Sequence, residues 1–174
     1  ATIQKNEMNI QKQIKQNPVK NTQTIVIFSN DLDKALAAFI IANGAKASGY
    51  DVTLFFTFWG LNILRRDNVN IKKSFLDKML GFMMPKGADK LTLSKMNMGG
   101  IGSIVLKWVM KNRNVLTLKE LILQAKANGV KFIACQMSMD IMGIKKEELL
   151  DGVEIAGVAK YIAESSISDS NLFI

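Results

Sequence analysis

Cys135 is the residue in this chain whose type and position predict covalent chemistry. It is the only cysteine, and it ends the mostly apolar run at 130–135. The pattern after it, at 136–144, predicts a turn and the start of a helix. Backbone N–H groups and the helix dipole at such a strand-to-helix junction favour a thiolate. The position therefore predicts a reactive thiol, against the alternative that a lone cysteine on a strand is an inert core residue.

A thiolate at this position could carry sulfur. It can attack the outer sulfur of a persulfide, polysulfide or thiosulfate and hold that sulfur until another thiol takes it. This reaction requires a low thiol pKa, a stabilised anion and access for the donor, but no metal or histidine. Backbone N–H groups after Cys135, helped by Ser138, would stabilise the anion, and Gln136 and Met137 lie beside it. Asp140, expected in the first turn of the helix, would stabilise that helix but would oppose the thiolate through its charge, and both effects stay open at this point.

The composition excludes several other kinds of site. The 174 residues are 48% hydrophobic and 22% charged, which is typical of one globular domain. Histidine is absent, so histidine-based dyads and triads and ordinary zinc sites are excluded. The ten methionines more often serve as flexible packing than as a copper site. We therefore expect no metal and no cofactor. The single cysteine suits a reducing compartment, so we expect a cytoplasmic protein.

The net charge of +8 raises the question of an anionic partner. Nucleic acid or an anionic membrane surface would fit such a charge. The basic residues are scattered and show no aromatic-interleaved motif, so we expect no nucleic-acid binding. No stretch reaches the length of about 18 apolar residues that a spanning helix needs. A peripheral contact with a membrane or a membrane protein stays among the candidate partners.

Strand and helix patterns alternate along the chain. Apolar runs predict strands at 24–28, 50–58, 130–135, 153–156 and 171–174. Helical spacing lies between them, and Thr117 with Glu120 predicts a capping box at the start of one helix. A solvated helical face is expected at 145–148. The alternation predicts a single-domain, three-layer α/β fold, with a mostly parallel sheet of about five strands and helices on both faces.

The domain is expected at residues 24–174, after a polar tail or frayed helix at 1–23. A long insertion of helices and loops at 61–115 is expected to form a lid or an oligomer contact. The carboxyl ends of parallel strands meet at one edge, so Asn30 and Trp59 should lie near Cys135. Met96 and Met98, in a loop of the insertion, are further candidates for the wall of a pocket that suits a small anion or sulfur species.

Several segments of the chain resemble the DsrE/DsrF-like superfamily, and more narrowly its larger branch, whose members are often labelled DsrE family or peroxiredoxin family. These segments are the Cys-Gln-Met-Ser block within 134–144 and the stretches at 55–60, 94–98, 147–149, 152–154 and 157–159. The resemblance covers about residues 24–174. It implies a five-stranded, mostly parallel α/β fold, homo-oligomers that are often trimers or hexamers, and a cysteine that carries sulfur as a persulfide. Cys135 is the matching position.

The chain departs from true peroxiredoxins, because it lacks a Thr-x-x-Cys pattern at Cys135 and a second cysteine. We therefore expect a sulfur carrier or sulfurtransferase-like protein that receives sulfur from a donor protein or small sulfane-sulfur compound and passes it to a partner thiol. Two alternatives stay open. One is a non-enzymatic scaffold of a redox or sulfur-metabolism complex, with a buried Cys135 and an exposed apolar surface on the insertion. The other is a small-molecule or nucleotide-binding module on the same fold.

Overall fold

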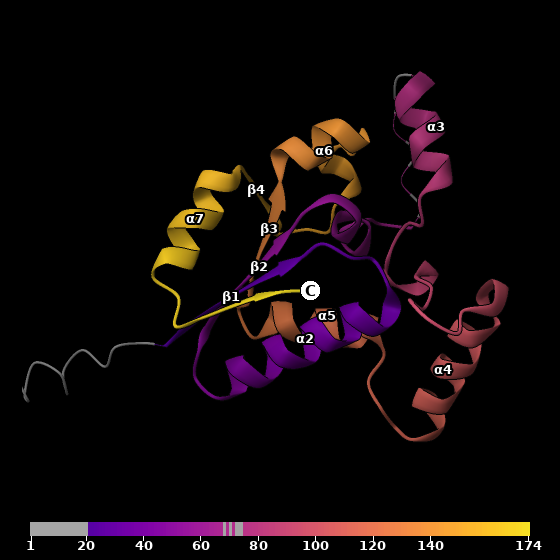
Figure 1. Cartoon of the computed structure of the whole chain (residues 1–174), viewed down its shortest axis with the longest axis horizontal. Helices are drawn as coiled ribbons and strands as arrows, with labels where there is room; N and C mark the ends of the chain where they lie inside the picture. The colour runs from indigo at the N-terminus through magenta and orange to yellow at the C-terminus, as the bar shows by residue number, and fades with distance from the viewer. Residues whose placement is uncertain (1–20, 68, 70, 72–74) are drawn as a thin grey trace, which may run out of the picture.

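The fold is built on a five-stranded parallel sheet, seen in a computed structural model (Figure 1). The structure describes residues 21–67, 69, 71 and 75–174, so the expected tail lies outside it up to residue 20. The strands are β1 (Thr22–Ile27), β2 (Asp51–Phe56), β3 (Lys131–Cys135), β4 (Glu154–Ala156) and β5 (Ser170–Phe173). Their order is β4-β3-β2-β1-β5, and each neighbouring pair is parallel. The predicted α/β class is confirmed, with a sheet that is parallel throughout.

Helices cover both faces of this sheet (Figure 1). On one face, α2 (Leu32–Ala47) and α5 (Leu118–Ala127) bury apolar side chains against the central strands in one large cluster. On the other face lies α7 (Val158–Ser166), whose Tyr161 packs against a smaller cluster. The two short elements α6 (Gln136–Met142) and η4 (Lys146–Glu148) connect β3 to β4. The capping box predicted for α5 is present, with Glu120 and Thr117 bonded reciprocally.

The second strand is shorter than the sequence predicts. The chain leaves the sheet after Phe56, and the 3₁₀ helix η1 (Phe58–Leu64) takes up the rest of the apolar run. Gly60 explains this departure, because its N–H donates to the carbonyl oxygen of Phe28 at 2.8 Å. A Cβ atom at this glycine would lie 2.1 Å from the carbonyl oxygen of Ile27. The close crossing of η1 over the end of β1 therefore requires glycine.

The prediction of a solvated face at 145–148 is wrong at Glu148. This side chain is buried and forms an ion pair of 2.7 Å with the buried guanidinium of Arg65. The same guanidinium donates to Asn62 Oδ1 at 3.1 Å. The two partners are 83 residues apart, so helical spacing could not reveal the pair. The pair fixes the end of η1 against η4.

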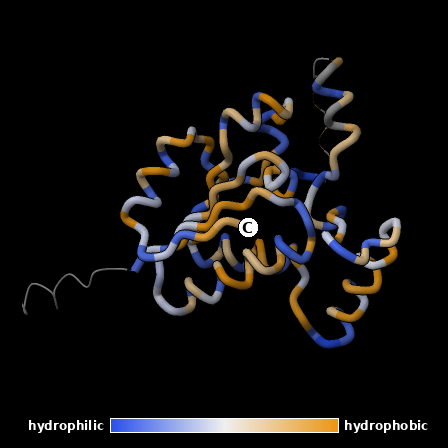
Figure 2. The backbone as a smooth tube through the Cα atoms, in the orientation of Figure 1, coloured by the Kyte–Doolittle hydropathy of each residue, from blue (hydrophilic) through white to orange (hydrophobic). Residues whose placement is uncertain are grey.

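The region after η1 contains two helices at the end of the molecule opposite α7, namely α3 (Phe75–Met83) and α4 (Ile101–Asn112) (Figure 1). Two short 3₁₀ turns, η2 (Ala88–Lys90) and η3 (Met98–Gly100), lie between them. The connecting loop is bonded to the start of α2, because Leu32 N–H donates to the carbonyl of Thr92 at 2.7 Å. Asp33 accepts hydrogen bonds from the backbone and hydroxyl of Ser94. Both helices contain apolar as well as polar residues along their length (Figure 2).

Candidate functional site

Cys135 is the last residue of β3 and the N-cap residue of α6. The predicted strand-to-helix junction is therefore confirmed. Its register partner is Ala156 on β4, where the next connection also leaves the sheet. Within the described part of the chain, no hydrogen bond joins the sulfur to a side chain, and the thiol does not cap α6. Cys135 thus lies at the carboxyl edge of the sheet, where β3 ends and a short helix begins.

The thiol faces the α7 side of the sheet. Side chains alternate along β3, so that Phe132 and Ala134 join the large cluster under α2 and α5. Ile133 and Cys135 join the small cluster instead, with Ala156 and Tyr161 packed against it. The Tyr161 ring lies 5.1 Å from that of Phe55, another member of this cluster. Cys135 is only 5% exposed as a consequence.

Ser138 belongs to a polar contact beside the thiol. Its side chain is completely buried, and its hydroxyl lies 2.8 Å from the hydroxyl of Thr57 at the end of β2. This contact ties α6 to the neighbouring strand end. Thr57 was missed at the sequence level, although it is the one hydroxyl between Leu54 and Trp59 in an otherwise apolar run.

Gln136 and Met137 lie at the start of α6 and are exposed. The amide of Gln136 donates to Asp140 Oδ1 at 2.9 Å, so this side chain is directed along the helix. The expectation that Asp140 lies in the first helical turn is wrong, because α6 begins at Gln136 and holds no acidic residue in that turn. The Asp140 carboxylate lies beyond the first turn and accepts the hydrogen bond from the Gln136 amide.

The remaining predicted wall residues are spread over the carboxyl side of the fold. Asn30 is half-buried in the turn between β1 and α2, and Trp59 is 49% exposed on η1. Met96 and Met98 are strongly exposed on a loop that is bonded to the start of α2. That loop is fixed on the α2 side, whereas Cys135 packs on the α7 side. The structure therefore brings Ser138 close to the thiol junction but does not join the methionine loop to it.

The Asp33–Ser94 contact shows how the loop is held. Burial raises the pKa of the Asp33 carboxyl, but hydrogen bonds from the Ser94 hydroxyl and N–H outweigh this and lower that pKa below its ordinary value. The two hydrogen bonds from Ser94 therefore favour the ionised carboxylate of Asp33. The anchor is complete at neutral pH.

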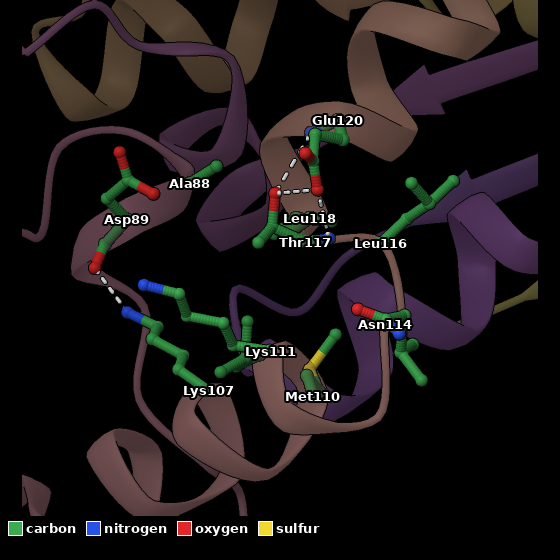
Figure 3. A pocket seen from close by; sticks show the side chains of 12 residues that line it. Ala88, Asp89, Lys107, Met110, Lys111, Asn114, Leu116, Thr117, Leu118 and Glu120 are labelled. Atoms are coloured by element: carbon green, nitrogen blue, oxygen red, sulfur yellow. Dashed lines mark hydrogen bonds between the residues drawn. The ribbon is translucent and has the colours of Figure 1, made fainter.

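A cavity of about 540 Å³ lies between α4 and the start of α5 (Figure 3). Lys107 and Lys111 line one side, and Lys107 donates to the carbonyl oxygen of Asp89 at 2.5 Å. Thr117 and Glu120 line the other side, where hydrogen bonds from Thr117 lower the pKa of the Glu120 carboxyl. Leu32 of α2 also lines this cavity, which places it on the face opposite the thiol. The cavity and Cys135 are therefore separate features.

Comparison with known proteins decides the family. A model of the DsrE/DsrF/DrsH-like family matches residues 20–173. This chain belongs to that family. The superfamily resemblance seen in the sequence is thereby confirmed.

Two relatives cover almost the same length. The uncharacterized protein YrkE of Bacillus subtilis (strain 168) is 55% identical over 152 residues, which are 87% of this chain and 95% of the relative. The sulfur carrier protein DsrE2 of Allochromatium vinosum is 38% identical over 154 residues, which are 86% of this chain and 96% of the relative.

A solved structure supports the fold of this family member. The protein of unknown function MTH1491 from Methanobacterium thermoautotrophicum superposes with a TM-score of 0.51 at 15% identity. The match covers 87% of this chain and 98% of the other. Among the described residues, no helix is both long and apolar enough to cross a membrane.

Proposed function

We propose that this protein is a sulfur carrier that holds sulfane sulfur as a persulfide on Cys135. The observation that supports this most directly is the position of the single thiol at the junction of β3 and α6. Membership of the DsrE/DsrF/DrsH-like family and the likeness to a relative named as a sulfur carrier support the same role. A cytoplasmic, reducing setting belongs to this proposal, because it keeps the thiol available.

The transfer step balances without a metal or an added oxidant. The Cys135 thiolate attacks the outer sulfur of a donor persulfide R–S–S–H, and a sulfur–sulfur bond forms on Cys135. The bond in the donor breaks, and the donor leaves as R–S⁻ with the electron pair. An acceptor thiolate then attacks the outer sulfur of the Cys135 persulfide, which regenerates the Cys135 thiolate. With no second cysteine in the chain, the acceptor is another protein or a small thiol.

Access to the sulfur is the physical requirement that the burial of Cys135 imposes. The residue is 5% exposed, beneath a layer to which Ala156 and Tyr161 contribute. A donor can reach the sulfur only when this layer opens locally. In this proposal α7 therefore regulates the reaction, and the Ser138–Thr57 contact holds the amides at the start of α6 in place while α7 moves.

Intact-protein mass spectrometry tests the proposal. After incubation with polysulfide, the wild-type protein should gain the mass of one or more sulfur atoms, and a thiol reductant should remove it. The Cys135→Ser variant should gain nothing, since no other thiol is present. An unchanged wild-type mass, at a pH at which a small thiol reagent does modify Cys135, would count against the carrier role.

A second candidate function has its own supporting observation. A non-enzymatic scaffold would show a buried cysteine together with exposed apolar side chains in the insertion at 61–115. Cys135 is buried, and Phe82, Ile104 and Trp108 are largely exposed. If the Cys135→Ser variant complements loss of the wild-type protein in cells, the scaffold role is favoured over sulfur transfer.

A further inference from the structure

We propose that α4 attaches this protein peripherally to an anionic lipid surface. The inference goes beyond sulfur transfer and does not depend on it. It combines the direction of one apolar helical stripe with the distribution of charge along the chain.

The apolar stripe of α4 is directed outward. Ile101, Ile104, Val105 and Trp108 follow the spacing i, i+3, i+4, i+7, which places them on one helical face. A surface helix normally turns such a stripe towards the core, but these four side chains are 52–70% exposed. The helix is anchored through other residues, because Ser103 and Met110 are the buried ones. The outward face of α4 is therefore the apolar face.

Most of the net charge of the protein lies in the same region. Residues 67–115 contain nine basic and three acidic residues, which gives +6 of the total of +8. Arg65 and Arg66 are left out of this sum, because Glu148 and Asp151 pair with them. Lys111 and Arg113 are exposed on and just after α4, and Lys95 is exposed on the loop before it. An outward apolar stripe bordered by exposed cations is typical of helices that lie on an anionic membrane.

The chemistry of this surface favours lipid over the other occupants. Eight of the nine basic residues are lysines. A lysine ammonium is a point charge on a flexible side chain, so it suits the diffuse negative charge of lipid headgroups better than the fixed carboxylates of a protein partner. A second copy docked through the same face would bring two segments of +6 together. Trp108 supplies an indole ring, which prefers the level of the headgroups.

The geometry fits a helix that lies in the plane of the lipid surface. The twelve residues of α4 are about 18 Å long at 1.5 Å per residue, well short of the ~30 Å hydrocarbon layer. The exposed methionines Met96 and Met98 precede α4 and would extend the apolar contact. The thiol packs on the α7 face of the sheet, whereas the cavity beside α4 is lined by Leu32 of the opposite face, so the thiol takes no part in the lipid contact.

Vesicle sedimentation of the full chain tests the proposal. The wild-type protein should sediment with phosphatidylcholine vesicles that contain phosphatidylglycerol, and far less with pure phosphatidylcholine. Added salt should release it, because a contact between surface charges is screened. The Cys135→Ser variant should bind equally well, so this outcome is separable from sulfur transfer.

Matched substitutions assign the contact to α4. Ile104→Ser should lower the vesicle partition coefficient by about tenfold, whereas Ile167→Ser at the end of α7 should leave it unchanged. Both isoleucines are 70% exposed in the free protein. Lys111→Glu should lower the vesicle partition coefficient about fivefold or more. Lys146 is also exposed but lies outside residues 67–115, so Lys146→Glu should have little effect.

Fluorescence gives an independent measurement, because the chain has two tryptophans. In a Trp59→Phe variant, the remaining Trp108 emission should shift to shorter wavelength when anionic vesicles are added. In a Trp108→Phe variant, the Trp59 emission should not shift.

The proposal is wrong if anionic vesicles do not bind the protein, or if the α4 variants and their controls bind equally. It is also wrong if Ile104→Ser instead dissociates a self-associated species, which would identify the stripe as a contact between copies.

Discussion

At the scale of single residues, the reactivity of Cys135 depends on its neighbours on the α7 face. The sulfur lies in a small cluster with Val26, Phe55 and Ile133. This cluster is much smaller than the core on the opposite face, and its outer layer is only partly buried. A cover made of few contacts opens locally at low free-energy cost. The thiol can therefore be protected at rest and still react.

The two tyrosines of the chain allow a matched test of this cover. Tyr161→Ala removes a ring that packs on the thiol cluster, and the rate of Cys135 modification by a disulfide reagent should rise on the order of tenfold. Tyr50→Ala removes a ring that packs on the opposite core, and the rate should stay near that of the wild type. Stopped-flow absorbance gives both rates, and thermal unfolding identifies any global loss of stability. Equal rates for both variants would show that α7 does not control access.

Glu148 and Glu147 form a second matched pair. Glu148 is buried against Arg65, and its neighbour Glu147 is exposed. Glu148→Ala leaves a buried guanidinium without its carboxylate and should lower the free energy of unfolding by about 3–5 kcal/mol. Glu147→Ala should change it by less than about 0.5 kcal/mol. Urea denaturation followed by circular dichroism measures both, and similar effects would mean that the ion pair is not structurally important.

At the scale of elements, the carboxyl edge is shaped by the 3₁₀ helix η1 as well as by the strands. The crossing of η1 over β1 depends on the absence of a side chain at Gly60. It brings Thr57 next to Ser138 and sets Trp59 at the surface. The site therefore depends on a turn that the strand pattern conceals.

Two glycines with opposite surroundings test this dependence. A methyl group at Gly60 would overlap the carbonyl of Ile27, so Gly60→Ala should destabilise the protein by about 3 kcal/mol. Gly44 lies within α2 with nothing within 4 Å of the position of its Cβ. Gly44→Ala should stabilise the helix by about 0.5–1 kcal/mol. Calorimetric melting should show shifts of opposite sign, and a neutral Gly60→Ala would contradict the close crossing.

At the scale of the whole molecule, the thiol packs on one face of the sheet, and α4 lies beside the helices of the other face. Helix α7 lies at one end of the molecule and α3 and α4 at the other (Figure 1). The thiol stands between them at the start of α6, a helix that contacts α3. A protein attached to lipid through α4 would keep the α7 face, on which the thiol packs, free for donor and acceptor. This separation is compatible with both proposals acting at once.

The homo-oligomer implied by the family resemblance stays a prediction at this scale. If it forms, it should use a surface other than α4, because like charges on residues 67–115 repel. Sedimentation velocity should then give a trimer or hexamer for the wild-type protein, and Ile104→Ser should leave its size unchanged. A monomer at a protein concentration on the order of tens of micromolar would contradict the expected homo-oligomer.

The sequence by itself determined the elements and their order. Apolar runs placed the strands within a few residues, and the Thr117–Glu120 box marked the start of α5 correctly, because these signals are local. The single cysteine at a strand-to-helix junction was predictable for the same reason.

Only the tertiary structure decided which way these elements face. The stripe on α4 has the pattern of a core helix but is directed outward, and Glu148 has the pattern of a surface helix but is buried on Arg65. The tertiary structure also decides on which face of the sheet the thiol packs. Periodicity records which residues share a face, whereas burial depends on contacts between residues far apart in the chain, which no local pattern contains.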